Sequence, residues 1–474
     1  MSAGARAAVV AVVGIATFAA GCGDNLRPVT DGVRSGDRLA ATFWVGGGAR
    51  LFAGFFDREL GLRCRFELLP DDERAVCVPA AASAEATAFL DDRCTTPLVR
   101  ATVTPSGERP RVARVEADVC EPPAFWALGE AIEVPQFYTR TSYGACAWRA
   151  ASPGEPWYPG ARHLPIDELV GGRVRVEDRG QTLHLRYVDG DDGSRQPIGV
   201  YDARMGAPCA FTDQLFDGDA ALACYPDLCA LELDRRLDRA CRPVLFSVAQ
   251  GPGWPVSCAC AARRFALIAA SAPPLRAPEI REIGSELPEP VELFAENGDT
   301  CEYTGYVSSP AWRTGDAVAP IAGRRAVLEG TGRLRPLAIV ADDDGTEVLE
   351  PWLRDREVAI ECQPRLARDG VRRCLPSGLT QLADSFFADD ACTHPARVAY
   401  AVDFDGSTRW AIVDDIDGRR AVYQVTGELL PGNLYRRFAE VCAPHSWSVP
   451  FERFFVVGPE AAPERFAVMT ELVE

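Results

Sequence analysis

The sequence predicts an all-β protein made of three copies of one unit of about 150 residues. Three observations lead to this. A set of cysteine, proline, aspartate and glycine landmarks recurs three times in the same order. Short apolar stretches alternate with Gly-rich or Asp-Gly turns, as in antiparallel hairpins. Stretches with helical periodicity are few, and Ala82–Leu90 and Leu379–Phe387 offer two turns each at most.

Composition sets the class of protein before any motif is considered. The chain has 474 residues, of which 47% are hydrophobic and 25% charged, as in ordinary globular proteins. All 50 basic residues are arginine, so lysine Schiff bases and a P-loop lysine are excluded. A net charge of −18 argues against a nucleic-acid partner. The 17 cysteines point to an oxidising compartment.

Residues 1–21 resemble a lipoprotein signal peptide. Arg6 gives a basic start, and the 14 apolar or small residues 7–20 are too few to span a bilayer. The segment ends in Ala-Ala-Gly before Cys22, as in a lipobox. We therefore expect cleavage before Cys22, lipidation of that cysteine and a membrane partner through this anchor. Removing Cys22 leaves 16 cysteines, an even number that can all pair.

Residues 22–34 follow as a flexible tether that contains proline and glycine. By resemblance to lipoprotein sorting, Gly23 after the cysteine is not an inner-membrane retention signal, so the outer membrane is expected. The protein should thus be exported and lipid-anchored to the bacterial envelope.

The three copies are predicted to span residues 35–179, 180–329 and 330–474. Each carries four shared cysteines in order, with a Cys-x-Pro step at the second and an aspartate three residues before the third. The cysteines of the first copy are Cys64, Cys77, Cys94 and Cys146, those of the second are Cys209, Cys224, Cys241 and Cys301, and those of the third are Cys362, Cys374, Cys392 and Cys442.

Each copy divides into two halves of roughly 75 residues with about four strands each. Six such half-units predict a six-bladed β-propeller, because radial stacking buries both faces of every four-stranded sheet. The alternative is three tandem β domains. The short turns at the copy junctions favour the propeller, since separate domains are usually joined by longer linkers.

The cysteines are expected to form disulfides. Of the three pairings open to four positions, we favour the second with the third, which leaves the first with the last. The favoured pairs are Cys77–Cys94, Cys224–Cys241, Cys374–Cys392, Cys64–Cys146, Cys209–Cys301 and Cys362–Cys442. Four extra cysteines, Cys120, Cys229, Cys258 and Cys260, would supply two more bridges. Spacing leaves the connectivity open.

No catalytic, cofactor or metal motif stands out. The close-set Cys258-x-Cys260 pair fits disulfides better than zinc in an exported protein. Acidic turns at 189–193, 342–345, 403–406 and 415–418 fit hairpin turns better than calcium loops. The four histidines, His163, His184, His394 and His445, form no zinc-hydrolase pattern. We therefore expect no cofactor and no metal.

A ligand site should lie where the copies differ, because one site on a ring needs to appear only once. The insertion at 251–278 in the second copy is the first candidate.

The function most consistent with the sequence is a non-enzymatic binding or display module for an unknown surface or periplasmic ligand. An extracytoplasmic hydrolase acting on glycan or peptide, and a structural envelope protein, remain alternatives. A carboxylate paired with His163 or His184 in a central funnel would favour the hydrolase.

Three stretches carry a family resemblance: the Asp-Gly-Ser-Arg turn at 192–195, Arg-Cys-Leu-Pro at 373–376 and the Phe386–Thr393 segment. With these, the mature chain resembles uncharacterised cysteine-rich repeat lipoproteins of high-GC Gram-negative bacteria. The resemblance implies an envelope location and a repeated architecture, and carries no known activity. The first two copies depart from the Cys-Leu-Pro step.

Overall fold

The structure is a computed structural model. It describes residues 32–69, 73–79, 83–85, 88–100, 111–115, 123–141, 145–152, 156–178, 182–213, 222–226, 244–246, 265–268, 279–286, 291–297, 300–307, 311–376, 380–383, 386–394, 396, 398–402, 410–414, 418–429, 434–438, 441–444 and 452–474.

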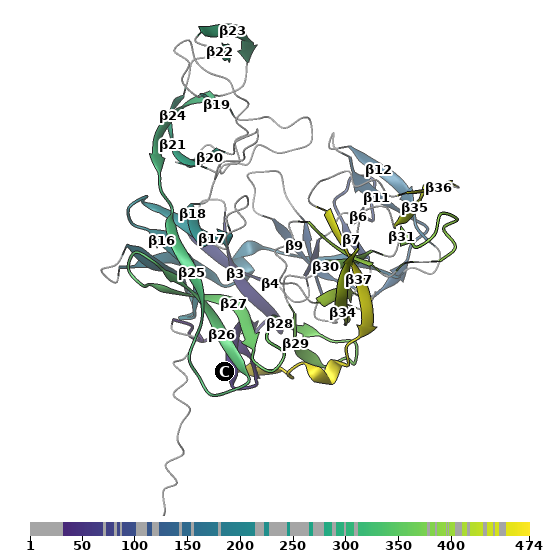
Figure 1. Cartoon of the computed structure of the whole chain (residues 1–474). Coiled ribbons are helices and arrows are strands. Elements are labelled where there is room, and N and C mark those ends of the chain that lie inside the picture. The colour runs from purple at the N-terminus through teal and green to yellow at the C-terminus, as the bar shows by residue number, and fades with distance from the viewer. Residues whose placement is uncertain are drawn as a thin grey trace, which may run out of the picture.

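The described chain is all-β, with large antiparallel sheets and two short 3₁₀ turns, as the sequence predicts (Figure 1). The first halves of the three copies, together with the last strand of each copy, join into one 15-stranded sheet. Its order is β29-β28-β27-β26-β25-β18-β17-β16-β15-β14-β4-β3-β2-β1-β38. The strands are β1 (Leu39–Gly46), β2 (Ala49–Asp57), β3 (Leu62–Leu68), β4 (Arg74–Pro79), β14 (Gly171–Glu177), β15 (Leu183–Gly190), β16 (Arg195–Asp202), β17 (Ala207–Asp213), β18 (Leu222–Pro226), β25 (Ile321–Val327), β26 (Leu334–Ala341), β27 (Glu347–Asp355), β28 (Ile360–Leu366), β29 (Arg372–Pro376) and β38 (Thr470–Val473).

This order contains three runs of five antiparallel strands. Strands β14 to β18 form one run and β25 to β29 another, each from consecutive strands. The third run takes β1 to β4 from the start of the chain and β38 from its end, where Thr42 pairs with Val473. The last strand of the chain therefore completes the first run.

The two ends of the strand order meet through the residues just before β38. Arg373 of β29 forms an isolated antiparallel bridge with Val468. The Cys374 N–H donates to the Ala467 carbonyl at 2.8 Å, and the Met469 N–H donates to the Arg372 carbonyl at 2.9 Å. A similar bond joins β4 to the residue before β14, from the Cys77 N–H to the Val170 carbonyl at 2.9 Å.

The described strands do not show the six-bladed propeller. A propeller requires separate sheets stacked face to face, whereas β4 pairs with β14 and β18 pairs with β25 edge to edge. Across the predicted copy boundaries, β14 pairs with β15, β25 with β26 and β38 with β1, so the copies are joined by strand pairing and are not three separate domains on a string. The sequence pattern is compatible with either arrangement, because alternation predicts strands and turns but not which strand edges meet. The copy boundaries remain predictions.

The second halves form smaller sheets that project from the 15-stranded sheet (Figure 1). In the first copy they build a nine-stranded sheet, in the second a four-stranded sheet and a hairpin, and in the third a closed five-stranded sheet and a three-stranded one. The first copy contributes β5 (Ser83–Glu85), β6 (Ala88–Phe89), β7 (Pro97–Arg100), β8 (Val112–Val115), β9 (Ala124–Leu128), β10 (Ile132–Glu133), β11 (Gln136–Arg140), β12 (Cys146–Ala150) and β13 (Pro156–Leu164). The second contributes β19 (Val244–Phe246), β20 (Phe265–Ile268), β21 (Glu279–Glu286), β22 (Val291–Asn297), β23 (Thr300–Val307) and β24 (Ala311–Val318). The third contributes β30 (Thr380–Ala383), β31 (Phe386–Phe387), β32 (Val398–Val402), β33 (Trp410–Asp414), β34 (Arg420–Leu429), β35 (Tyr435–Phe438), β36 (Val441–Pro444) and β37 (Glu452–Glu460).

Strand pairings in the first and third second halves correspond closely. A parallel pair, β5 with β8, recurs as β30 with β33. The chain β8-β9-β13-β7 recurs as β33-β34-β37-β32, and β6-β11-β12 recurs as β31-β35-β36. In the second copy, the strand order β20-β21-β24-β19 corresponds to β8-β9-β13-β7 of the first copy. Each second half thus combines a set of four or five paired strands with a hairpin, which in the first copy joins the same sheet through β6 and β7.

The main cores lie between each first half and the second half of the same copy. In the third copy, Leu353 and Cys362 pack with Trp410 and Phe466. In the second, Cys209 and Cys224 pack with Phe265 and Ile280. In both copies, large aromatic side chains therefore pack near the disulfide-bonded cysteines of the first half.

The hairpin turn of each copy's first half docks onto the first strand of another copy. In the second copy, Asp192 Oδ2 accepts the N–H groups of Arg38, at 3.2 Å, and Leu39, at 2.7 Å. In the third copy, Asp344 Oδ2 accepts those of Thr182, at 2.7 Å, and Leu183, at 3.1 Å. These bonds link the second copy to the first and the third to the second.

The remaining link runs from the first copy to the third. There the turn is Gly46-Gly47-Gly48, and the Gly47 carbonyl accepts the Leu334 N–H at 2.9 Å. A Cβ on Gly48 would lie 2.7 Å from the Gly332 Cα, so glycine is required for this approach. The Gly47 carbonyl thus accepts the hydrogen bond that an aspartate carboxylate accepts at the other two junctions. Each copy is therefore bonded to both of the others through a hairpin turn.

A buried aspartate ends the second strand of each first half. Asp57, Asp202 and Asp355 are at most 2% exposed. Each accepts the N–H groups two and three residues further on. Arginine side chains complete the bonding, from Arg38 and Arg333 in the first and third copies.

In the second copy, the arginine that bonds the buried aspartate stands at a different position in the sequence. Thr182 stands where the other copies have Arg38 and Arg333, and Arg204 bonds Asp202 instead. Arg204 occupies the position of Glu59 and Glu357, which pair with the arginines of the other two copies. The buried carboxylate therefore keeps a cationic partner in every copy.

We expect Asp355→Ala to lower the free energy of unfolding by about 3–5 kcal/mol, because it leaves Arg333 and two N–H groups without their acceptor. Glu357→Ala is the matched control. It removes the exposed partner of the same arginine and should cost about 1 kcal/mol or less. Guanidinium denaturation under oxidising conditions measures both, and equal losses would contradict the assigned role of Asp355.

Deleting residues 330–474 removes the partner of Leu183, the partner of the Gly47 turn and strand β38. We expect the remaining 35–329 fragment to lose cooperative thermal unfolding, since strand edges and apolar faces become exposed. Near-ultraviolet circular dichroism of fragment and full chain makes the comparison. A soluble fragment with a sharp transition would mean that the copies fold independently.

Candidate functional site

The disulfides correct the predicted pairing. The first cysteine bonds the second in each copy, as Cys64–Cys77, Cys209–Cys224 and Cys362–Cys374, with Cα atoms 5.2–5.4 Å apart. The third bonds the fourth, as Cys94–Cys146 and Cys392–Cys442. The predicted pairing, of the second cysteine with the third and of the first with the fourth, is therefore wrong in all three copies. The wrong pairs are Cys77–Cys94, Cys64–Cys146, Cys374–Cys392, Cys362–Cys442, Cys224–Cys241 and Cys209–Cys301.

Strand register explains the observed pairing. Strands β3 and β4 are adjacent and antiparallel, so Cys64 and Cys77 lie on neighbouring strands within bonding reach. The same holds for β17 with β18 and for β28 with β29. Spacing suits either a loop closure or a hairpin staple, and only the register distinguishes them. Cys22, Cys120, Cys229, Cys241, Cys258 and Cys260 lie outside the described residues, as does the side chain of Cys301.

The aspartate before the third cysteine shapes a tight loop. The Asp91 carboxylate accepts the N–H groups of Arg93 and Thr95, each at 3.0 Å, and of Thr96, at 2.6 Å. The Asp389 carboxylate makes the same bonds with Ala391, Thr393 and His394. Cys94 and Cys392 adopt positive φ values of 53° and 51° in these loops. The aspartates therefore hold each cysteine in a backbone conformation that presents it to its partner.

The pKa values of both carboxyl groups are low. Partial burial raises the pKa of Asp91, but the hydrogen bonds from Thr95 and Thr96 outweigh it and lower that pKa to about 2. For Asp389, the hydrogen bond from the Thr393 N–H is the main cause of a pKa of about 2. Both groups are thus carboxylates over the whole physiological range.

Each loop holds a hairpin by two cross-strand neighbours. In the first copy, Cys146 of β12 bonds Cys94, while its register partner Arg140 of β11 donates to the Cys94 carbonyl at 3.3 Å. The Arg140 guanidinium also lies over the Phe89 ring, 5.3 Å from its centroid. One disulfide and one arginine therefore fix both strands of the hairpin to the loop.

The third copy repeats the arrangement. Cys442 of β36 bonds Cys392, and its register partner Arg437 donates to the Cys392 carbonyl at 2.7 Å. Arg437 lies over Phe387 at 5.3 Å from the ring centroid, the same distance as in the first copy. Along the chain, the hairpin β22–β23 of the second copy lies between β21 and β24, as β11–β12 lies between β9 and β13. We call β11–β12, β22–β23 and β35–β36 the distal hairpins.

The distal hairpins carry the most exposed large hydrophobic side chains of the described chain. Val441, Trp148 and Tyr303 are 66%, 64% and 56% exposed, and each lies on a different distal hairpin. The sequence analysis missed these residues. A signal was present, because Trp148 and Tyr303 both stand two residues after the fourth shared cysteine.

The polar residues considered as metal or catalytic groups have structural contacts. Asp192 and Asp344, from the acidic turns, bind backbone N–H groups of another copy. Among the described residues, no group of three or more His, Cys, Asp or Glu side chains is placed to hold a metal ion. The acidic turns at 403–406 and 415–418 and the insertion at 251–278 lie mainly or wholly outside the described residues.

The three described histidines lie apart from one another. The His163 ring stands edge-on to Trp126 at 5.3 Å between centroids. His184 Nε2 lies 3.3 Å from the largely exposed Asp178, and His394 Nδ1 lies 3.0 Å from Asp389 in the loop described above. His445 lies outside the described residues.

Several disulfides in one chain indicate an extracellular or periplasmic location. Across the part of the chain that the structure describes, there is no helix with the length and hydropathy needed to cross a membrane. The fold and the loop-bound hairpins thus define a disulfide-stapled, all-β extracytoplasmic protein.

Comparison with known proteins places the chain in a family. The model of a family of unknown function (DUF7481) matches residues 21–131 and 113–466, and the chain belongs to this family. Neither the curated proteins nor the solved structures contain a match.

We expect the loops at Asp91 and Asp389 to lose stability as the pH falls from about 4 towards 2. Their pKa values are near 2 in the folded protein and near 4 in unfolded chains, so their stabilisation is complete above pH 4 and disappears through this window. Thermal unfolding of the wild type and of Asp91→Asn/Asp389→Asn measures it. The variant should show a smaller loss over that window, and an identical pH dependence would contradict the role of the two groups.

Proposed function

We propose that this protein is an exported lipoprotein, anchored to the outer membrane through a lipid on Cys22, whose β-rich body is a non-enzymatic module that binds or displays a ligand. Its partners are then the membrane, through the anchor, and a surface or periplasmic ligand. Nucleic acid is not a suitable partner for a body with a net charge of −18.

One geometric relation carries the proposal. The Ser35 hydroxyl donates to the Glu474 carbonyl at 3.1 Å, so the start of the folded body lies beside the C-terminus. The C-terminus lies at the lower end of the molecule, whereas β22–β23 lies at its upper end and β11–β12 and β35–β36 lie on its upper flank (Figure 1). An anchor that leads into Ser35 would hold the body by one end and direct the distal hairpins away from the membrane.

The polar groups shared by the copies support a binding or display role. Asp57 and its equivalents, and the loop aspartates Asp91 and Asp389, are saturated by hydrogen bonds that hold the fold together. Those groups are engaged in architecture. The three most exposed large apolar side chains of the described chain are on the distal hairpins, which points to contact with a ligand there.

The proposed anchor also has sufficient reach. The chain between Cys22 and Arg34, whose N–H donates to the Arg195 carbonyl of the body, is twelve residue steps long, and an extended chain of that length spans up to about 40 Å. The body would stand clear of lipid headgroups on such a tether.

Replacing Cys22 with Ser should release the protein from the membrane fraction into the soluble fraction. Acyl chains contribute about 0.8 kcal/mol per buried methylene, and several chains on one cysteine hold a protein firmly. Envelope fractionation after a high-salt wash compares wild type, Cys22→Ser and Asn25→Ser. The last variant changes the tether but keeps the cysteine, so it should stay with the membranes. If Cys22→Ser also pellets, the proposed lipid anchor is wrong.

A further inference from the structure

We infer that the distal hairpins form a repeated binding surface for an uncharged polysaccharide, whose sugar rings stack on the exposed aromatic side chains. The inference rests on the proposed function, because it names the ligand class of that binding module.

Exposure singles out the same element in every copy. The three large hydrophobic side chains with the highest exposed fractions in the described chain are Val441, Trp148 and Tyr303, one on each distal hairpin. Leaving such groups in water is unfavourable, and a recurrent exposed apolar surface marks a place of contact.

Cross-strand pairs enlarge this surface. Trp148 pairs with Tyr138, and Tyr303 pairs with Phe294, whose ring centroid is 5.7 Å away in an edge-on arrangement. In the third copy Tyr435 pairs with Pro444. Each hairpin therefore presents a ring and a flat apolar neighbour across two strands, and each of these six side chains is partly or largely exposed.

Two of the three distal hairpins are fixed to a loop before any ligand arrives. In the first and third copies, the disulfide to the loop fixes one strand and the arginine bond to the same loop fixes the other. Side chains such as Trp and Tyr lose little conformational entropy on binding, and a preorganised surface reduces the cost further.

Charge selects an uncharged ligand. Residues 136–150 contain two arginines and no acidic residue, residues 291–307 contain four acidic residues and no arginine, and residues 435–444 contain two arginines and one glutamate. No single charged ligand is complementary to all three. The property that the hairpins share is aromatic and apolar surface, and pyranose rings offer apolar C–H faces together with uncharged hydroxyl groups.

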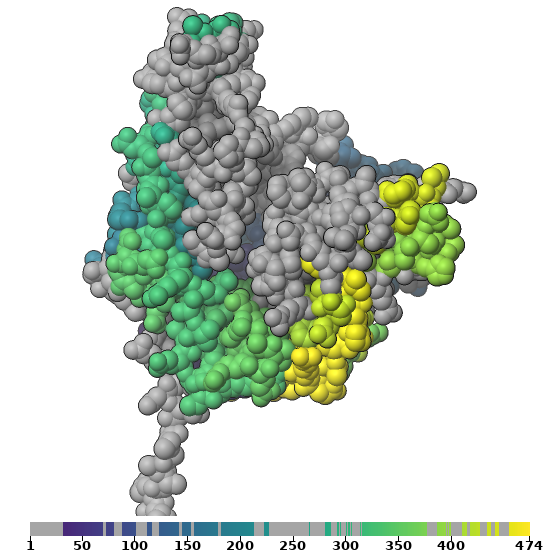
Figure 2. All heavy atoms as spheres, in the orientation of Figure 1, coloured from purple at the N-terminus to yellow at the C-terminus, as the bar shows by residue number. Residues whose placement is uncertain are grey.

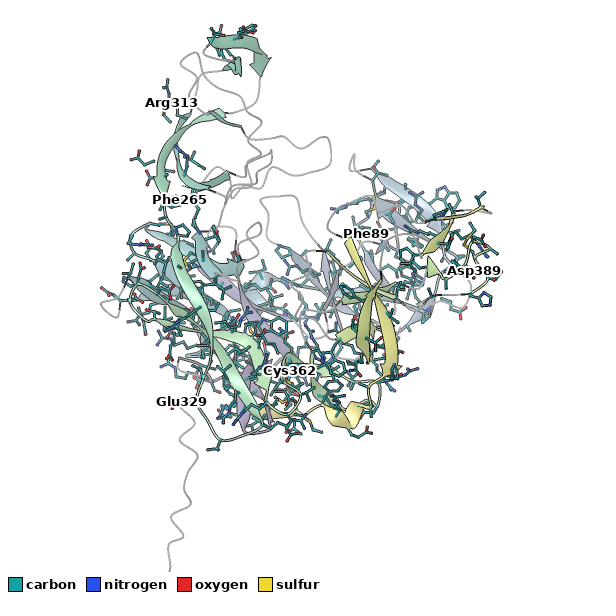
Figure 3. The ribbon with its side chains drawn as sticks, viewed as in Figure 1. Phe89, Phe265, Arg313, Glu329, Cys362 and Asp389 are labelled. Carbon is teal, nitrogen blue, oxygen red and sulfur yellow. A yellow bond between two sulfur atoms is a disulfide. The ribbon has the colours of Figure 1, made fainter. Side chains whose placement is uncertain are left out.

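Position and number favour a long polymer over a lipid surface. The hairpin β22–β23 lies at the end of the molecule opposite to the C-terminus, beside which Ser35 is held (Figures 1 and 2). The labelled Phe89, under the hairpin β11–β12, and Asp389, in the loop that holds β35–β36, also lie away from that end (Figure 3). Three separated contacts on one chain of sugars add avidity that a monosaccharide cannot exploit.

Affinity electrophoresis in native gels tests the inference with the full-length protein. The gels contain hydroxyethylcellulose, dextran, soluble starch, galactomannan or, as the anionic comparison, alginate, and a polyoxyethylene detergent without a sugar headgroup keeps the protein in solution. We expect at least one neutral polymer to retard the wild type. Trp148→Ala should weaken the retardation at least about threefold and Trp148→Ala/Tyr303→Ala more strongly, because the contacts act together.

Two controls separate ring stacking from damage to the fold. Trp148→Phe keeps an aromatic ring and should retain most of the retardation. Val327→Ala removes an apolar side chain that is 51% exposed on β25, outside the distal hairpins, and should behave as the wild type. Near-ultraviolet circular dichroism checks that every variant is folded.

Three results would overturn the inference: no retardation by any of the neutral polymers, equal retardation of the wild type and the double variant, or retardation by alginate alone. A parallel experiment floats the Cys22→Ser protein with phosphatidylcholine vesicles, and flotation that depends on Trp148 would assign the hairpins to lipid instead. The fractionation of Cys22→Ser is independent of these outcomes, so failure of the polysaccharide inference is distinguishable from failure of the anchor.

Discussion

The contact between the hairpin turn of one copy and the first strand of another is the constraint on which the arrangement depends. Two of these contacts use an aspartate carboxylate and the third uses the carbonyl of Gly47. Buried N–H groups at a strand start need an acceptor, and each copy obtains it from a neighbour and not from itself. The copies are therefore incomplete singly, which explains why the first halves share one sheet.

The buried aspartates perform the corresponding task within each copy. Asp57, Asp202 and Asp355 end a strand, close the following turn and receive an arginine. That arginine also donates to the carbonyl of a residue in the segment that returns from the second half, at Glu168, Ala319 and Arg465. One charged pair thus links both halves of a copy. The shift of the arginine to position 204 in the second copy shows that the pair matters more than the position of its cation.

The shared cysteines have two separate tasks. The first and second staple adjacent strands in the core, where the sulfur atoms are buried. The third and fourth attach a projecting hairpin to a loop shaped by an aspartate. The second task places an exposed aromatic or apolar pair on a rigid support. The family is of unknown function. The distal hairpins are the feature of this chain that most directly suggests where a ligand binds.

The sequence by itself determined the all-β class, the oxidising compartment and the recurrence of landmarks, because alternation, turn residues and cysteine content are local properties. It did not determine the sheet order, the disulfide partners or the exposed pairs on the distal hairpins. Cys77 can reach Cys64 or Cys94 equally well along the chain, and only the register of β3 against β4 selects the first. From the sequence alone, Trp148 would be taken for a core residue. It is exposed because the hairpin that carries it projects from the sheet. Pairing between distant strands and exposure of a side chain are properties of the assembled fold, so only the tertiary structure decided them.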